Sequence, residues 1–182
     1  MEKSHRKVRM LTEGAICIAL AEILSFIPLY KMPWGGSVDL GMLPIILYCV
    51  RWGFGAGMVA SFTHAVFQLL EGGIAIGWQS IIGDFIVAYS VLGLAGLFKG
   101  NFFLGTVVAC VARFLVHYVV GATLWAEYMP ETFFNMTMTS PWIYSALYNA
   151  PYVLTDMVLI LVIGAILMKT PAKKYITGQD LA

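Results

Sequence analysis

The chain has 182 residues, of which 60% are hydrophobic and only 12% are charged, and its net charge at pH 7 is +1. The mean hydropathy of +0.82 is far too high for a soluble domain, whose surface must be covered by polar side chains. The charge is too close to neutral for nucleic acid to be a partner. In lipid, backbone polar groups must pair within the chain, so the composition predicts an all-α integral membrane protein with one domain, residues 1–182.

Six apolar segments, divided by charges and by Gly/Pro clusters, are candidates for membrane-spanning helices. A membrane core of about 30 Å needs about 20 helical residues. The predicted spans are 9–28, 39–51, 53–71, 76–98, 101–124 and 144–168. The second is short, so we expect it to be tilted, partly re-entrant or covered by its neighbours. We therefore predict a bundle of six transmembrane helices in a lipid bilayer.

The distribution of Lys and Arg predicts how this bundle is oriented. With six spans, nine of the eleven basic residues fall on one side, and Lys31 falls on the other. Because basic residues concentrate on the cytoplasmic side, both termini are predicted to be cytoplasmic. The segments 28–38, 71–75 and 125–143 are then external, and the last is long for a connection within a bundle.

Ionisable groups inside a membrane are costly and usually face a partner or a cavity. Arg113 and Asp156 each lie roughly 18 Å from the cytoplasmic end of their spans, which are consecutive and antiparallel. We predict a structural ion pair between them, with a role in transport as the alternative. His64 is predicted to be a satisfied histidine of the bundle interior, not a ligand-binding residue. Glu22 has no predicted partner.

A second group of polar and aromatic residues is predicted nearer the external side. Asp84 and His117 each lie roughly 12 Å from the outer end of their helix. Gly121 and Trp125 follow His117 at steps of four, so the three share one helical face. The start of the sixth span and the first external segment add Tyr144, Ser145, Asn149, Trp34 and Asp39.

This external cluster has the composition of a site for a flat organic cation. Carboxylates neutralise the positive charge, and aromatic faces add cation–π attraction of about 1–2 kcal/mol when desolvated. The sequence places Lys31 as the basic residue at this level, so an anion would find few partners. For Trp142 and Tyr152 an interfacial aromatic belt is the favoured interpretation, but a belt does not explain the carboxamide of Asn149.

The sequence contains no phosphate-binding loop, no metal-binding motif and no nucleophile–base pair, so no catalytic residue, metal or cofactor is predicted. Uphill transport would then need an ion gradient or a partner that hydrolyses ATP. In the first span, Ala15 and Ala19 form an AxxxA arrangement that lets a second helix approach closely in lipid. Its spacing is equally compatible with docking of a partner and with packing inside the bundle.

Several separated motifs resemble the thiamine-specific substrate-binding S-components of energy-coupling factor (ECF) transporters. In chain order they are Arg9–Glu13 with Ala15 and Ala19, Leu43–Ile46 leading to Arg51, Gln79–Asp84, Gly93–Phe98, His117–Trp125 and Tyr144–Asn149. The resemblance implies a six-helix protein of the bacterial plasma membrane that binds extracellular thiamine with high affinity. It also implies three partners, a transmembrane coupling protein and two cytoplasmic ATPases, so that the chain itself is not an enzyme.

The resemblance also implies roles for individual residues. Asp84 matches the carboxylate that faces the charged part of the ligand, and Ala15 and Ala19 match the docking face for the coupling protein. The other matched pocket positions are Trp34, Asp39, His117, Gly121, Trp125, Tyr144, Ser145 and Asn149. Two alternatives stay open: an S-component for another flat vitamin or a thiamine precursor, and a proton-coupled organic-cation transporter with Asp84 and Asp156 as proton sites.

Overall fold

The computed structural model describes residues 2–70 and 75–181, with side chains from Ser4 onward. Most of the chain is helical. The longest α-helices are α1 (Glu2–Ser25), α2 (Met42–Trp52), α3 (Phe54–Leu70), α6 (Phe102–Thr123) and α7 (Pro141–Leu167). Between α3 and α6 lies one continuous helical segment, made of α4 (Trp78–Ser80), η1 (Ile81–Val87), α5 (Ala88–Ser90) and η2 (Val91–Phe98).

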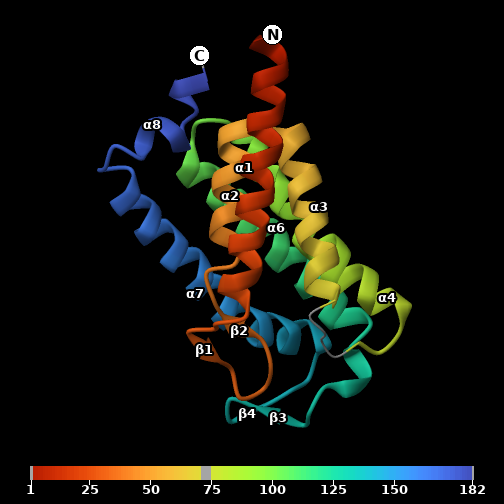
Figure 1. The fold of residues 1–182 in the computed structure, drawn as a ribbon. Helices are drawn as coiled ribbons and strands as arrows, with labels where there is room; N and C mark the ends of the chain where they lie inside the picture. The colour runs from red at the N-terminus through yellow and green to blue at the C-terminus, as the bar shows by residue number, and fades with distance from the viewer. Residues whose placement is uncertain (1, 71–74, 182) are drawn as a thin grey trace.

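Two short antiparallel hairpins lie at one end of the bundle. β1 (Tyr30–Lys31) pairs with β2 (Ser37–Val38), and β3 (Thr132–Phe133) pairs with β4 (Met136–Thr137). Figure 1 shows both hairpins opposite the two chain termini. We call these ends the hairpin end and the terminal end. The remaining short elements are η3 (Ala126–Tyr128), α8 (Lys173–Ile176) and η4 (Gln179–Leu181).

The helices overlap all six predicted spans, with differences at their ends. α1 begins at Glu2 instead of residue 9, and α7 begins at Pro141 because Ser140 caps it, accepting a hydrogen bond from the Trp142 N–H at 3.3 Å. Of the predicted external segments, 28–38 and 125–143 form the two hairpin regions, while 71–74 lie outside the described residues. Within the described residues, three helical segments are long and apolar enough to cross a membrane: 78–98, 102–123 and 141–167.

α2 is short and lies in the core of the bundle. Its 11 residues rise roughly 16 Å, about half the thickness of a membrane core. Gly53, with φ +90°, ends α2, and a Cβ on Gly96 would lie 2.6 Å from the Gly53 carbonyl carbon, so η2 and this turn are in close contact. Nine α2 residues are buried, and α1, α3, α6 and η2 pack around them. The predicted cover by neighbouring helices is therefore present.

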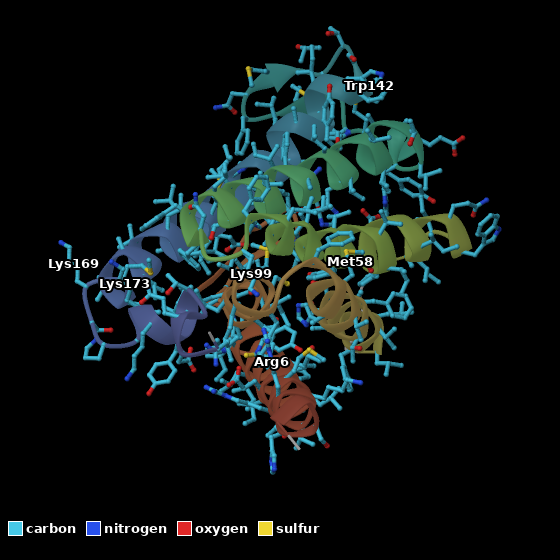
Figure 2. All side chains as sticks on the ribbon, turned by 90° about the horizontal axis from the view of Figure 1, so that it is seen from above. Arg6, Met58, Lys99, Trp142, Lys169 and Lys173 are labelled. Carbon is cyan, nitrogen blue, oxygen red and sulfur yellow. The ribbon has the colours of Figure 1, made fainter. Side chains whose placement is uncertain are left out.

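Both termini lie at the same end of the bundle, as the distribution of basic residues predicted. Arg6 on α1, Lys99 after η2 and Lys173 on α8 all belong to segments at this end, and Figure 2 shows them spread across it in a view along the bundle. The fold thus gathers basic residues that are far apart in the sequence onto one end.

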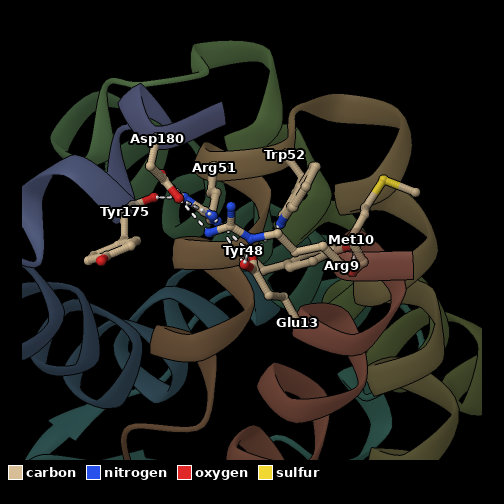
Figure 3. Close-up of polar contacts among 8 residues, drawn as sticks. All are labelled: Arg9, Met10, Glu13, Tyr48, Arg51, Trp52, Tyr175 and Asp180. Atoms are coloured by element: carbon tan, nitrogen blue, oxygen red, sulfur yellow. Dashed lines mark hydrogen bonds and ion pairs between the residues drawn. The ribbon is translucent and has the colours of Figure 1, made fainter. Parts of the chain in front are cut away.

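Arg51, near the end of α2, connects three parts of the chain at the terminal end (Figure 3). Its Nε donates to Oε2 of Glu13 on α1 at 2.6 Å, and its Nη1 donates to Oδ1 of Asp180 on η4 at 2.6 Å. Nη1 also donates to the main-chain oxygen of Tyr175. Arg9 pairs with both Glu13 and Asp180. These contacts attach α1 and the C-terminal segment to α2.

His64 and Glu22 are partners in the interior of the bundle. His64 is completely buried, and its Nδ1 lies 2.6 Å from Oε1 of Glu22. Gln68 donates to Oε2 of the same carboxylate at 3.2 Å. His64 on α3 thus pairs with α1 through Nδ1, and the same contact places Glu22. The buried Nε2 of His64 has no hydrogen-bond partner among the described residues, so the histidine lies in the bundle interior as predicted but is only partly satisfied.

Candidate ligand-binding site

A cavity of about 500 Å³ lies toward the hairpin end, within the volume range of small-molecule sites. Its walls come from the segment between β1 and β2, from η1 and α5, from α6 and the turn after it, and from α7. These parts are far apart in the sequence, so the cavity exists only in the folded chain.

One wall depends on a change of helix type. η1 is a π-helix, in which the hydrogen bonds join residues five apart, and it contains Asp84. Asp84 and Tyr89 are five apart, and both line the cavity. The sequence predicted an ordinary helix over 76–98 and therefore missed Tyr89, because no residue pattern in this segment distinguishes a π-helix from an α-helix. π-Helical turns occur frequently at functional sites.

A second wall, next to η1, is one face of α6 and its continuation. Arg113, His117, Gly121 and Trp125 follow one another at steps of four, and all line the cavity. Gly121 allows α7 to approach closely, because a Cβ at this position would lie 2.3 Å from Oγ of Ser145. α6 and α7 are therefore in close contact at Gly121, where a larger residue does not fit.

Asp84 is fixed by two hydrogen bonds from this wall. Its Oδ1 lies 3.0 Å from Nδ1 of His117, and its Oδ2 accepts a hydrogen bond from the Trp125 indole N–H at 2.8 Å. With Nδ1 donating to the carboxylate, Nε2 of a neutral His117 is an acceptor. This Nε2 is buried and has no hydrogen-bond partner among the described residues. The pair therefore places a negative charge at the cavity and leaves one buried acceptor of His117 unpaired.

Aromatic rings connect the two hairpin regions beside the cavity. Trp34, between β1 and β2, packs edge-on against Phe133 and Phe134, with ring centres 5.5 and 4.8 Å apart. Its indole N–H donates to the main-chain oxygen of Tyr148 on α7 at 3.3 Å. Phe133 also packs edge-on against Tyr144. Trp34 and Tyr144 were predicted site residues, whereas Phe133 and Phe134 were not, because they are about 100 residues from Trp34 and no spacing pattern indicates the contact.

Eight of the nine residues predicted to bind a ligand line this cavity, namely Trp34, Asp84, His117, Gly121, Trp125, Tyr144, Ser145 and Asn149. Asp39 is the exception. Its Oδ1 accepts from the Gly41 N–H at 2.8 Å and its Oδ2 accepts from Oγ of Ser37 at 3.0 Å. The Asp39 carboxylate thus stabilises the turn into α2 and is not part of the cavity wall.

Arg113 departs from the prediction in a different way. Its Nη1 lies 3.7 Å from Oδ2 of Asp156, within ion-pair distance, so the two predicted partners are together. Arg113 also lines the cavity, whereas the sequence placed Lys31 as the basic residue at this level. The sequence did not indicate that Arg113 lines the cavity, because the cavity extends along the same face of α6 to a greater depth than His117.

The aromatic-belt interpretation has a different outcome for Trp142 and for Tyr152. Trp142 is 43% exposed and packs on Tyr118, away from the cavity, which fits a residue at a membrane interface. Tyr152 is only 6% exposed and lines the cavity, so the belt interpretation is wrong for it. Helical periodicity on α7 could have indicated this, because Tyr152 is seven residues from Ser145 and lies on the same face.

A family model described as thiamine transporter protein (Thia_YuaJ) matches residues 11–176. The chain belongs to this family. It is similar to the thiamine transporter ThiT of Bacillus subtilis (strain 168), with 29% identity over an alignment that covers 93% of this chain and 95% of that protein. It is also similar to the thiamine transporter ThiT of Lacticaseibacillus paracasei, with 26% identity over an alignment that covers 98% of this chain and 95% of that protein.

A solved structure of ThiT from Listeria monocytogenes has the same fold as this chain. Its TM-score is 0.78 at 26% identity, and the match covers 93% of this chain and 98% of that one. The resemblance to thiamine-specific transport proteins is therefore confirmed. These relatives are named transporters and not enzymes, and a membrane protein of this family accounts for the apolar composition and the three long apolar helices.

Proposed function

We propose that this protein is the thiamine-binding subunit of an ATP-driven ECF uptake transporter in a bacterial plasma membrane. It forms one domain of six transmembrane helices with cytoplasmic termini, and it captures thiamine with high affinity from the extracellular side. The observation that carries the proposal is the cavity of this thiamine transporter family member, in which Asp84 is held by His117 and Trp125 beside aromatic rings.

In the proposed binding mode, the thiazolium ring lies near Asp84 between aromatic side chains of the cavity. The carboxylate neutralises the ring's positive charge, and the faces of Trp34 and Trp125 add cation–π attraction. The aminopyrimidine ring forms hydrogen bonds with groups from His117, Tyr144 and Asn149. Thiamine is bound and released chemically unchanged.

The outer face of α1 supports the proposed partners. Ala15 and Ala19 are exposed, and so are their larger neighbours Leu11, Ile16 and Leu20. Small residues on such a face let another transmembrane helix approach closely. We propose that the coupling protein docks here and that two cytoplasmic ATPases supply the energy, since this chain carries no ATP-binding motif.

Thiamine titration of the detergent-purified protein, followed by intrinsic tryptophan fluorescence, tests the binding function. Because Trp34 and Trp125 line the cavity, we expect saturable quenching at nanomolar concentrations. Asp84→Asn should lose this response, while Glu131→Gln is the matched control, since it removes an exposed negative charge near the same end but outside the cavity. Absence of quenching up to millimolar thiamine would contradict the proposal.

A competition panel and a transport assay separate this proposal from its two rivals. An S-component for another flat vitamin or a thiamine precursor would bind that compound more tightly than thiamine. A proton-coupled organic-cation transporter would move its substrate in liposomes that contain no ATPase. We expect neither result: thiamine should be the tightest ligand, and the chain alone should not transport it.

A further inference from the structure

We propose that Arg113 determines ligand specificity from the inner part of the cavity, by donating hydrogen bonds to an acceptor atom on the uncharged ring of the ligand. This inference rests on the proposed function and deepens it. It defines the ligand class as a molecule with a cationic ring at one end and a neutral, acceptor-bearing ring at the other.

Arg113 occupies a deeper position in the cavity than His117. It precedes His117 by four residues on the same face of α6, so it lies roughly 6 Å further from the hairpin end. Only 7% of its surface is exposed, and it nevertheless lines the cavity together with Tyr89. A ligand that fills the cavity therefore reaches this guanidinium.

The protein leaves part of the Arg113 guanidinium without partners. Nη2 donates to Oη of Tyr89 at 3.0 Å, and the guanidinium carbon lies 4.5 Å from the centre of the same ring. Nη1 contacts Sδ of Met42 at 3.0 Å, which is a weak acceptor, and lies 3.7 Å from Asp156. Nε is buried and has no hydrogen-bond partner among the described residues.

The unpaired N–H groups of Arg113 would be stabilised by a hydrogen-bond acceptor. Arginine has five N–H donors, and burying them without acceptors is unfavourable. Oδ2 of Asp156 does not supply a hydrogen bond, because it too is without a partner among the described residues. An acceptor atom of a bound ligand would pair the donors of Arg113 and remove this cost.

The charges of the cavity then orient the ligand. Asp84 attracts a cationic ring, whereas the guanidinium of Arg113 repels it, and such effects are strong in low-dielectric surroundings. Asp156 weakens the repulsion, but it lies behind the guanidinium and does not line the cavity. The cationic ring is thus directed to Asp84, and the neutral ring is directed to Arg113. In thiamine the neutral ring is an aminopyrimidine, whose two ring nitrogens are acceptors.

The test compares thiamine with two analogues, each with one aminopyrimidine ring nitrogen replaced by CH. Dissociation constants are measured on the detergent-purified full chain by calorimetry. In the wild-type protein, we expect at least one analogue to bind more than about tenfold more weakly than thiamine. In the double variant Arg113→Gln/Asp156→Asn, which keeps the net charge of the pair unchanged, this ratio should fall below about threefold.

A milder variant covers the case in which the double variant does not fold. Tyr89→Phe keeps the ring that packs on Arg113 and removes the hydroxyl that accepts from Nη2, so the guanidinium loses its fixed direction. We expect it to reduce the thiamine-to-analogue ratio by about threefold. Glu131→Gln, outside the cavity, should leave the ratio unchanged.

The outcomes separate this inference from the function on which it rests. If the wild-type protein binds no thiamine, the proposed function and the inference both fail. If thiamine binds but both analogues bind equally well, or if the ratio is the same in wild-type protein and in the variants, Arg113 is only structural. The inference then fails while the proposed function stands.

Discussion

Arg51 and Arg113 are both buried arginines of the same bundle, but their surroundings differ. Arg51 makes five hydrogen bonds through all three of its nitrogens, four of them to the carboxylates of Glu13 and Asp180. Arg113 donates to Tyr89 and to the sulfur of Met42, and its Nε has no partner among the described residues. Complete pairing indicates a role in holding segments together, whereas incomplete pairing beside a cavity indicates a role toward a ligand.

The two ends of the bundle repeat this contrast. At the terminal end, Arg51, Glu13 and Asp180 pair with one another and attach α1 and the C-terminal segment to α2. Around the cavity, His117, Arg113 and Asp156 each keep a buried polar atom without a hydrogen bond among the described residues. Substitutions at the terminal end should therefore affect stability, and substitutions at the cavity should affect binding.

The largest effect is expected for Arg51→Met. The substitution removes four hydrogen bonds to carboxylates, but Arg9 still pairs with both Glu13 and Asp180. We therefore expect a loss of about 3 kcal/mol in the free energy of unfolding, at the lower end of the range for a broken buried ion pair. Thermal unfolding in detergent measures the change, and Lys174→Met is the matched control, because Lys174 is exposed at the same end. Thiamine affinity of the folded fraction should not change. A loss of affinity without a loss of stability would contradict the assigned role.

Asp84→Asn should change binding more than stability. The substitution removes the negative charge that faces a desolvated cation, so thiamine affinity should fall by about 2 kcal/mol or more, which is roughly 30-fold. Fluorescence titration gives the dissociation constant, and thermal unfolding of the same sample gives the stability. An unchanged affinity would remove Asp84 from the proposed site.

Gly121→Ala should affect both properties, because Gly121 lies in the cavity wall and in the contact between α6 and α7. The new Cβ would lie 2.3 Å from Oγ of Ser145, and such overpacking costs about 1–3 kcal/mol. Combining it with Ser145→Ala removes the atom in conflict, so the double variant should unfold at a higher temperature than Gly121→Ala alone. If it does not, the contact is not the cause.

The smallest effect is expected from the titration of Asp180. Its hydrogen bond with Arg51 lowers the pKa of the Asp180 carboxyl in the folded protein below the ordinary value of about 4. A lowered pKa stabilises the fold above the pKa of the unfolded chain, and this contribution is lost as the pH falls toward the folded-state value. Between about pH 5 and 3, wild-type stability should therefore fall more steeply than that of Asp180→Asn.

Most of the cavity wall could be predicted from the sequence because it follows helical periodicity. His117, Gly121 and Trp125 share one face by their spacing alone, and Ser145 and Asn149 do the same on α7. Asp39 could not be placed, because its role depends on the turn that brings Ser37 and Gly41 to its carboxylate. A loop residue has no periodicity from which a direction can be inferred.

The interior polar residues were also predicted only in part. Counting residues along each helix placed Arg113 and Asp156 at the same depth in consecutive helices. In the structure, Nη1 of Arg113 lies 3.7 Å from Oδ2 of Asp156. Depth could not indicate that Arg113 also lines the cavity, nor that Glu22 meets His64 across α1 and α3. Depth along a helix comes from counting residues, but the neighbour of a side chain depends on how each helix is rotated about its axis.

Composition, charge distribution and spacing were therefore sufficient for the membrane class, the helical segments, the shared end of the two termini and most residues of one face of the site. These properties depend on each helix separately, through its length, its apolar content and its period. The folded chain was needed for the π-helical turn at Asp84, the burial of α2, the pairing of Arg51 with Asp180 and the aromatic contacts of Trp34. The last three depend on contacts between segments distant in the chain, which only packing determines. The π-helical turn is local, but no residue pattern in this segment distinguishes it from an α-helix.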